Sequence, residues 1–190
     1  MRKLILFMML LLLCLPHAAA EESLIYANEG YGISFTLPEG WQDVSDENMT
    51  VFANSGDMLL LIGPTGHTVD ARLASSLNAT VAEEWVRNDR VFEDIVFTKF
   101  VPIMFSSAVD ENGKLFAFHS CGFAGEGFPE DFLFLYMQYL FTDSTGELCG
   151  VSLLTPNNDA SYEIFDWFDA MVMENIPENV LMALYEQIDE

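Results

Sequence analysis

The side chains that could do acid–base or metal chemistry are few and widely separated in this chain. His67 and His119 are the only histidines after residue 20, and neither has a second potential ligand at the spacing of a helical turn or a hairpin. Cys121 follows His119 at strand spacing, so a His–Cys metal pair is conceivable, but a histidine of the core or its rim is the favoured interpretation. Triads of Ser, His and Asp assemble from distant segments, yet no Gly-x-Ser-x-Gly motif anchors one here. We therefore predict no catalytic, cofactor-binding or metal-binding residue.

Two acidic segments, Asp110–Gly113 and Glu126–Asp131, contain the hard oxygen ligands that calcium prefers. Neither has the spacing of an EF-hand with its terminal glutamate, and Asp-Asn-Gly clusters are ordinary turn formers. We interpret both segments as turns. Asn48-Met49-Thr50 and Asn78-Ala79-Thr80 are formal glycosylation sequons. We regard them as coincidental, because the N-terminal segment is bacterial in style.

Cys121 and Cys149 invite a disulfide, since disulfides are common in exported proteins. Three expected strands, Lys114–Phe123, Phe132–Phe141 and Leu148–Leu154, are joined by short turns and should form an antiparallel meander. The two cysteines would then lie two strands apart, about 9–10 Å. A disulfide needs Cα atoms within about 7 Å. We expect two buried free thiols, and a disulfide would require a different strand order.

Residues 1–20 have the form of a secretory signal peptide. Two cations precede the apolar run Leu4–Leu15, which a proline and an alanine-rich end at Ala20 follow. The run is too short for a membrane-spanning helix, which needs about 20 apolar residues. Cys14 is a poor lipidation site, because Leu13 stands where lipoprotein signals have a small residue. We expect cleavage near Ala20 and an extracytoplasmic protein that is secreted or associated with the cell envelope.

The composition is that of an acidic protein with a large core. The 190 residues carry a formal charge of −23, and cleavage after Ala20 leaves five basic against thirty acidic side chains, a charge of −25. Such a charge disfavours nucleic acid and anionic membranes and permits basic partners. Apolar residues make up 51% of the chain and aromatic residues 13%, too many for a disordered coil. Residues 21–190 have the length of one domain.

The hydrophobic pattern predicts an α+β fold. Alternation and β-rich composition predict strands over Ser23–Ala27, Tyr31–Leu37, Met49–Ala53, Met58–Ile62, Ile95–Phe105, Lys114–Phe123, Phe132–Phe141 and Leu148–Leu154. Apolar residues at helical spacing predict one helix or two short ones over Asp70–Asn88, and further helices around Ile164–Met171 and from Pro177 onward. Pro102 suggests an edge strand or a bulge. Phe132–Phe141 is apolar on both sides, so the sheet should be covered on both faces.

The segment Tyr31–Trp41 resembles the opening strand of the PsbP-like family, in which an aromatic strand leads into proline and then a Gly-Trp pair. The order of the later elements is similar, so the resemblance covers most of Ser23–Ile176, with residues 177–190 as a possible helical extension. It implies an α/β/α sandwich with a central, mainly antiparallel sheet covered by helices on both faces. The family includes a photosystem II extrinsic subunit, a yeast Ran-binding nucleotide-release factor and bacterial envelope lipoproteins. No functional residue of the family matches a position here.

These observations favour a secreted or envelope-associated binding or scaffolding module for another protein, without catalytic activity and without a cofactor. The charge favours a basic partner surface. Two alternatives remain open. One is a small extracytoplasmic hydrolase with a cleft at the sheet edge, in which His67 or His119 meets a serine or carboxylate. The other is a calcium-dependent binding module.

Overall fold

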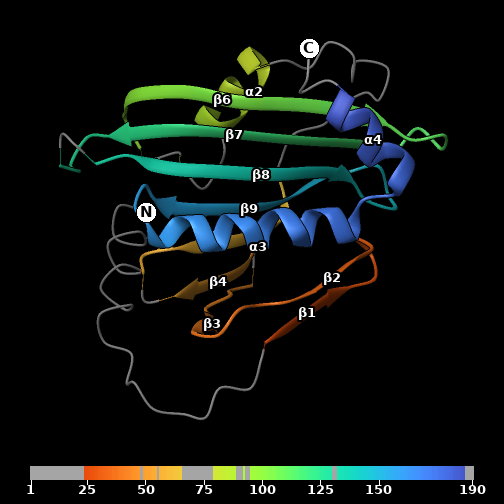
Figure 1. The fold of residues 1–190 in the computed structure, drawn as a ribbon, viewed down its shortest axis with the longest axis horizontal. Helices are drawn as coiled ribbons and strands as arrows, with labels where there is room; N and C mark the ends of the chain where they lie inside the picture. Colours follow the sequence, from red (N-terminus) through yellow and green to blue (C-terminus); the bar gives the residue numbers. More distant parts are fainter. Residues whose placement is uncertain are drawn as a thin grey trace.

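The computed structural model describes residues 24–47, 49–54, 56–65, 79–88, 92, 95–129 and 132–186 (Figure 1). Several predictions lie outside the described residues. They concern the signal peptide with Cys14, His67, the first part of the helix expected over Asp70–Asn88, both sequon asparagines, Glu130 with Asp131, and the last four residues.

The largest unit of the described chain is one seven-stranded antiparallel sheet with the order β3-β4-β5-β9-β8-β7-β6. A separate antiparallel pair is formed by β1 and β2. The strands are β1 Ile25–Asn28, β2 Ile33–Thr36, β3 Trp41–Asp43, β4 Thr50–Asn54, β5 Leu59–Pro64, β6 Phe97–Val109, β7 Leu115–Gly125, β8 Phe134–Thr142 and β9 Leu148–Pro156. The described helices are α2 Ala79–Asn88, α3 Ala160–Asn175 and α4 Glu178–Glu186.

The predicted meander is confirmed, because β7, β8 and β9 are neighbours in chain order. β6 lies at one edge of the sheet, and its pairing with β7 shifts register between Pro102 and Met104, as the proline suggested. One strand was not predicted. Trp41–Asp43 pairs with β4 at the opposite edge, directly after a turn in which Gly40 has φ +84°.

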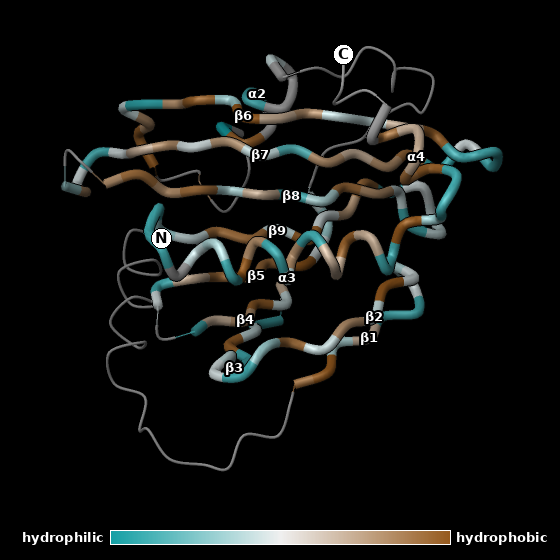
Figure 2. Tube along the Cα trace, viewed as in Figure 1, coloured by the Kyte–Doolittle hydropathy of each residue, from teal (hydrophilic) through white to brown (hydrophobic). Residues whose placement is uncertain are grey.

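The two faces of the sheet carry different clusters of buried side chains. The face that we call the α3 face presents Tyr139, Phe141 and Val151, which pack in one core cluster with Ile164 and Phe168 of α3. Figure 1 shows α3 lying along β9, with α4 crossing the strands towards β6. In Figure 2 the central strands are largely hydrophobic, whereas the turns at their ends are hydrophilic.

The other face, which we call the His119 face, presents His119 and a second aromatic cluster. Phe123, Phe134 and Tyr136 of this cluster are almost fully buried, and Val86 of α2 packs among them. Arg87 of the same helix lies over the rings of Phe97 and Phe100, at 5.1 and 5.0 Å from their centres. These contacts attach α2 to β6.

The β1–β2 pair is fixed to the edge of α3 by side-chain hydrogen bonds. The amide of Asn175 accepts a hydrogen bond from Ser34 N (2.9 Å) and donates one to Ser34 O (3.3 Å). Trp167 Nε1 donates to Thr36 O at 3.1 Å. Ile33 and Phe35 point into the core, as their predicted alternation requires.

Candidate functional site

Three polar side chains lie in one row across the centre of the His119 face. The strand register places His119 of β7 opposite Gln138 of β8, and Gln138 opposite Ser152 of β9. His119 Nε2 lies 2.7 Å from Gln138 Oε1. The Gln138 amide nitrogen donates to Ser152 Oγ and to Tyr136 OH, both at 2.9 Å. We call these four residues the His119 network.

A close backbone approach makes room for this network. Gly150 of β9 lies next to Gln138, and a Cβ at Gly150 would be 3.2 Å from the Gln138 amide nitrogen and 3.3 Å from Leu140 Cδ2. Such distances are tighter than ordinary side-chain contacts, so any larger residue would press on the amide that links the network. The glycine thereby helps to hold Gln138 in place.

His119 is neutral in this environment. Its side chain is only 2% exposed, and burial lowers the pKa of the imidazole to about 4, although the hydrogen bond with Gln138 acts in the opposite direction. Because the Gln138 amide nitrogen donates to Tyr136 and Ser152, its oxygen must accept from His119, which puts the imidazole proton on Nε2.

The His119 network does not form the base–nucleophile pair of a hydrolase. Ser152 Oγ receives its hydrogen bond from Gln138, and the hydrogen bond of His119 Nε2 also goes to that amide. A general base needs a hydrogen bond to the proton that it removes. Within the described residues no group of three or more His, Cys, Asp and Glu could hold a metal ion.

The two cysteines are free and buried, as predicted. Cys121 faces the same side as His119, whereas Cys149 belongs to the core cluster of the α3 face. Burial, with a further contribution from the charge of Glu83, raises the pKa of the Cys121 thiol to about 12. Burial, followed by the charge of Asp143, raises the pKa of the Cys149 thiol to about 11. Both side chains are therefore poor nucleophiles and poor metal ligands at neutral pH.

The acidic turns use their carboxylates to bind their own backbone. Asp110 Oδ1 accepts hydrogen bonds from the amides of Asn112 (2.9 Å) and Lys114 (2.8 Å). Asp143 Oδ1 accepts from the amides of Thr145 and Glu147 at 2.8 and 2.9 Å. Burial alone would raise the pKa of Asp143, but these hydrogen bonds outweigh it and lower the pKa. The segment Asp110–Gly113 is thus a turn that its first residue stabilises.

A second candidate site, which sequence reasoning missed, lies on the α3 face between the helix and the edge strand. The register aligns Val101 of β6 with Gly122 of β7 and Leu135 of β8. Val101 is 40% exposed, and Tyr162 of α3 is 62% exposed. We call the following residues the β6–α3 patch: Val101, Leu135, Met137, Tyr162 and Phe165.

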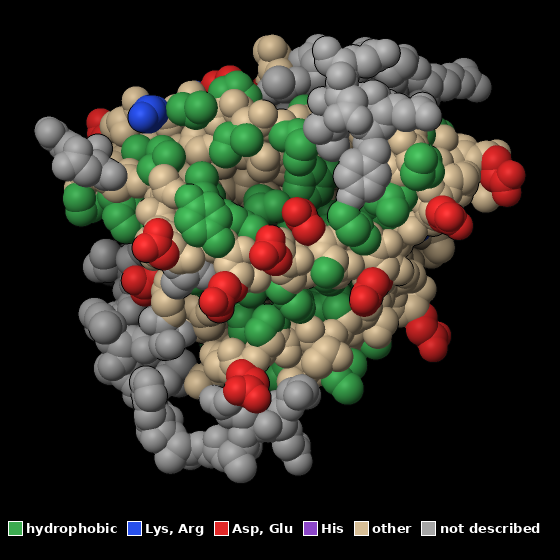
Figure 3. Space-filling view, in the orientation of Figure 1, with side chains coloured by type: hydrophobic (Ala, Val, Ile, Leu, Met, Phe, Trp, Pro, Cys, Tyr) green, Lys and Arg blue, Asp and Glu red, His purple; other side chains and the backbone are tan. Residues whose placement is uncertain are grey.

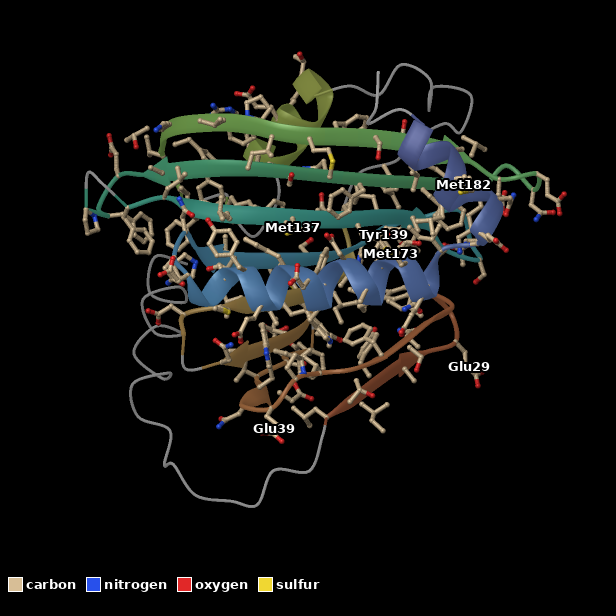
Figure 4. The ribbon with its side chains drawn as sticks, in the orientation of Figure 1. Glu29, Glu39, Met137, Tyr139, Met173 and Met182 are labelled. Atoms are coloured by element: carbon tan, nitrogen blue, oxygen red, sulfur yellow. The ribbon has the colours of Figure 1, made fainter. Side chains whose placement is uncertain are left out.

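The view of Figure 3 faces this patch. It shows hydrophobic side chains gathered over β6, β7 and β8 above α3, with acidic side chains along the helix below them. Figure 4 places Met137 on β8 close to α3, and Met173 on the helix itself. The sequence signal for the patch is weak, because the edge strand and the helix are about 60 residues apart and only the strand order brings them together.

The described residues contain no helix that is long and apolar enough to cross a membrane. Neither the protein-family models nor the curated proteins that we compared with the chain give a match. The resemblance to the PsbP-like family therefore stays a prediction from the segment Tyr31–Trp41.

Proposed function

We propose that this chain is an exported or envelope-associated module that binds another protein and has no catalytic activity. The observation that carries this proposal is the β6–α3 patch, an apolar surface in which Val101 and Tyr162 are exposed to solvent, with carboxylates at its border. Exposed apolar patches with a polar margin are typical of surfaces that bind other proteins.

The proposal includes the architecture that the PsbP-like resemblance implies, an α/β/α sandwich. Two contacts support helical layers on both faces of the sheet. Ile164 and Phe168 of α3 pack on the α3 face, and Val86 of α2 packs against the aromatic cluster of the His119 face. Proteins of such an architecture differ in activity, so the proposed role rests on the surface of this chain and not on its fold.

The state of the described reactive groups supports a non-catalytic role. His119 is buried and neutral, and its hydrogen bond goes to an amide instead of a nucleophile. The cysteine thiols are buried on opposite faces of the sheet. The charge of −23 supports a protein partner over nucleic acid or an anionic membrane, since both of these need cationic contacts.

The test is capture of a partner by residues 21–190 fixed to a resin, from the envelope fraction of the producing cell. A resin that carries an unrelated protein of similar negative charge is the control. We expect one protein to be enriched over the control and then to bind the purified chain saturably in calorimetry, with an affinity that falls as salt rises. Failure to find any saturable partner, or a hydrolase activity that His119→Gln abolishes, would contradict the proposal.

A further inference from the structure

The β6–α3 patch combines a shallow apolar floor with flexible side chains. Small residues on β7, among them Gly122, lie between Val101 on β6 and Leu135 on β8. Leu133 fills part of the space above Gly122, where a Cβ would lie 3.1 Å from its side chain. Met137 and Phe165 are partly buried against the core cluster and complete the floor. Methionine adapts its shape to an apolar partner at little cost.

The margin of the patch on α3 is acidic, because Asp166 and Asp169 come four and seven residues after Tyr162, on the same side of the helix. The helix carries Glu163, Asp166, Asp169 and Glu174 and contains no lysine or arginine. Asp169 is exposed, and its pKa is raised, first by the partial desolvation of its carboxyl group and then by the charge of Asp166. Two carboxylates beside each other on an apolar surface repel one another, so a cation placed between them would be stabilised.

Two of the three cations in the described part of the chain are engaged elsewhere. Arg87 forms an ion pair with Glu83 at 2.8 Å and lies over two phenylalanine rings. Lys114 lies over the rings of Phe116 and Phe141. The third, Lys99, is exposed on β6 and shares the α3 face with Val101, but β7 and β8 separate its strand from β9, along which α3 lies. A cation that satisfies the carboxylates of α3 has therefore to come from another molecule or from a basic residue outside the described ones.

We propose that the β6–α3 patch binds a cationic amphipathic segment of a partner protein, whose apolar side chains cover the patch and whose lysine or arginine side chains meet Asp166 and Asp169. This inference rests on the proposed function and adds to it the site and the chemistry of the partner. Charge argues against the other occupants. A second copy of the chain would bring a further net charge of −23 to the acidic margin. The same margin would repel an anionic membrane.

Three synthetic peptides of about 18 residues, or five helical turns, test the chemistry of the occupant. One is an amphipathic helix of leucine and lysine, the second has glutamate in place of lysine, and the third has serine in place of leucine. Fluorescence anisotropy at about 0.15 M salt, where exposed charges are screened beyond about 8 Å, measures their binding to residues 21–190. We expect 1:1 binding of the leucine–lysine peptide, no binding of the glutamate peptide, and at least tenfold weaker binding of the serine peptide.

Two pairs of variants test the position of the site. Val101→Asp changes the patch, and Val109→Asp is its matched control, because Val109 lies on the same strand, is 41% exposed and pairs with Leu115 of the His119 face. Asp169→Asn removes a margin charge, and Glu111→Gln removes one from an exposed turn. We expect each patch variant to lower the affinity for the leucine–lysine peptide about tenfold, which is the effect of losing an interface hot spot. Each control variant should change this affinity less than twofold.

Tyr162→Ala repeats the test on α3, where the side chain is so exposed that its loss leaves folding intact, and it should also weaken binding several-fold. Equal weakening by Val101→Asp and Val109→Asp would overturn the inference, because attraction would then be general. The inference would also be overturned if the serine peptide bound as tightly as the leucine–lysine peptide. It would likewise be overturned if the free chain formed a dimer and Val101→Asp abolished the dimer. If a partner is captured and all patch variants still bind it, the inference fails and the proposed function stands.

Discussion

At the scale of single residues, His119 illustrates how a reactive side chain becomes a structural one. It lies near the middle of β7, which has a neighbouring strand on each side, is almost completely buried, and has an amide as its hydrogen-bond partner. Gln138 satisfies two further buried hydroxyl groups, so the whole network depends on one side chain. Buried polar groups are tolerated only when they are paired in this way.

The buried imidazole predicts a pH dependence of stability. The pKa of His119 is about 4 in the folded chain, below the ordinary value of 6.5, so the unfolded chain binds the extra proton between these values. The contribution of His119 to the free energy of unfolding should therefore be complete above pH 6.5 and fall by about 2 kcal/mol as the pH drops to 5.0. Urea denaturation at pH 7.0, 6.0 and 5.0 measures this loss.

His119→Gln is the control for this effect, because its amide keeps a hydrogen-bonding partner for Gln138 but does not titrate. The carboxylates contribute equally to both proteins, so the difference between the two curves isolates the histidine. The prediction is wrong if both proteins lose the same free energy of unfolding between pH 7.0 and 5.0.

The cysteines carry the second prediction at this scale. Both thiols are buried and have raised pKa values, so we expect neither Cys121 nor Cys149 to react with Ellman's reagent at pH 8 until the chain unfolds. When residues 21–190 are unfolded in denaturant, both thiols should react with the reagent, even if the folded protein was first treated with a mild oxidant. Mass spectrometry of the intact protein without reductant supplies the second readout. A loss of two hydrogens there would show a disulfide and contradict the strand order.

At the scale of elements, the sequence patterns predicted the central strands of the sheet better than the strand β3 at its edge. Turn residues between the segments and an uninterrupted apolar run located β7, β8 and β9, and nearly all residues of these strands are buried. The short β3 was missed, because Gln42 and Asp43 are exposed and follow a Pro-Glu-Gly turn. Its strand character comes from pairing with β4, which a local pattern cannot show.

The contact between α3 and β2 is another long-range feature, and it predicts a measurable effect. Asn175 closes the edge of β2 with two hydrogen bonds to Ser34, as a neighbouring strand would. We expect Asn175→Ala to lower the free energy of unfolding by about 1–2 kcal/mol, since the backbone groups of Ser34 lose their partner. Hydrogen exchange of the Ser34 amide should become faster at the same time.

Asn179→Ala is the matched control for this contact. Asn179 is exposed in the first turn of α4, so its replacement should change the free energy of unfolding by less than about 0.5 kcal/mol. Equal effects of the two alanine variants, or unchanged exchange at Ser34, would show that the Asn175 amide does not hold the β1–β2 pair.

At the scale of the whole molecule, the candidate sites depend on strand order more than on sequence motifs. His119 and Gln138 are 19 residues apart in the sequence, and Gln138 and Ser152 are 14 apart. Only the register of the meander aligns the three residues. The turn lengths could have predicted that row. The β6–α3 patch could not be predicted in the same way, because the bulge near Pro102 and the position of α3 are set by tertiary packing.

The charge of the whole molecule gives the last prediction. The chain has a net formal charge of −23, and the mutual repulsion of the carboxylates in excess opposes the compact state. Salt shortens the reach of this repulsion from about 30 Å at 0.01 M to about 8 Å at 0.15 M. We expect the midpoint of thermal unfolding to rise by about 4 °C over this range of sodium chloride, equivalent to a gain of about 1–2 kcal/mol. Differential scanning fluorimetry measures it.

Magnesium and calcium chloride at equal ionic strength separate this screening from a specific calcium site. The carboxylates of Asp110 and Asp143 already accept hydrogen bonds from backbone amides, which a bound ion would have to replace. The two divalent salts should therefore raise the midpoint of unfolding equally, within about 1 °C, since both act as counterions. If the midpoint of unfolding rises more in calcium chloride than in magnesium chloride, and a chelator reverses the difference, general screening is contradicted. That result would favour a calcium-dependent binding module.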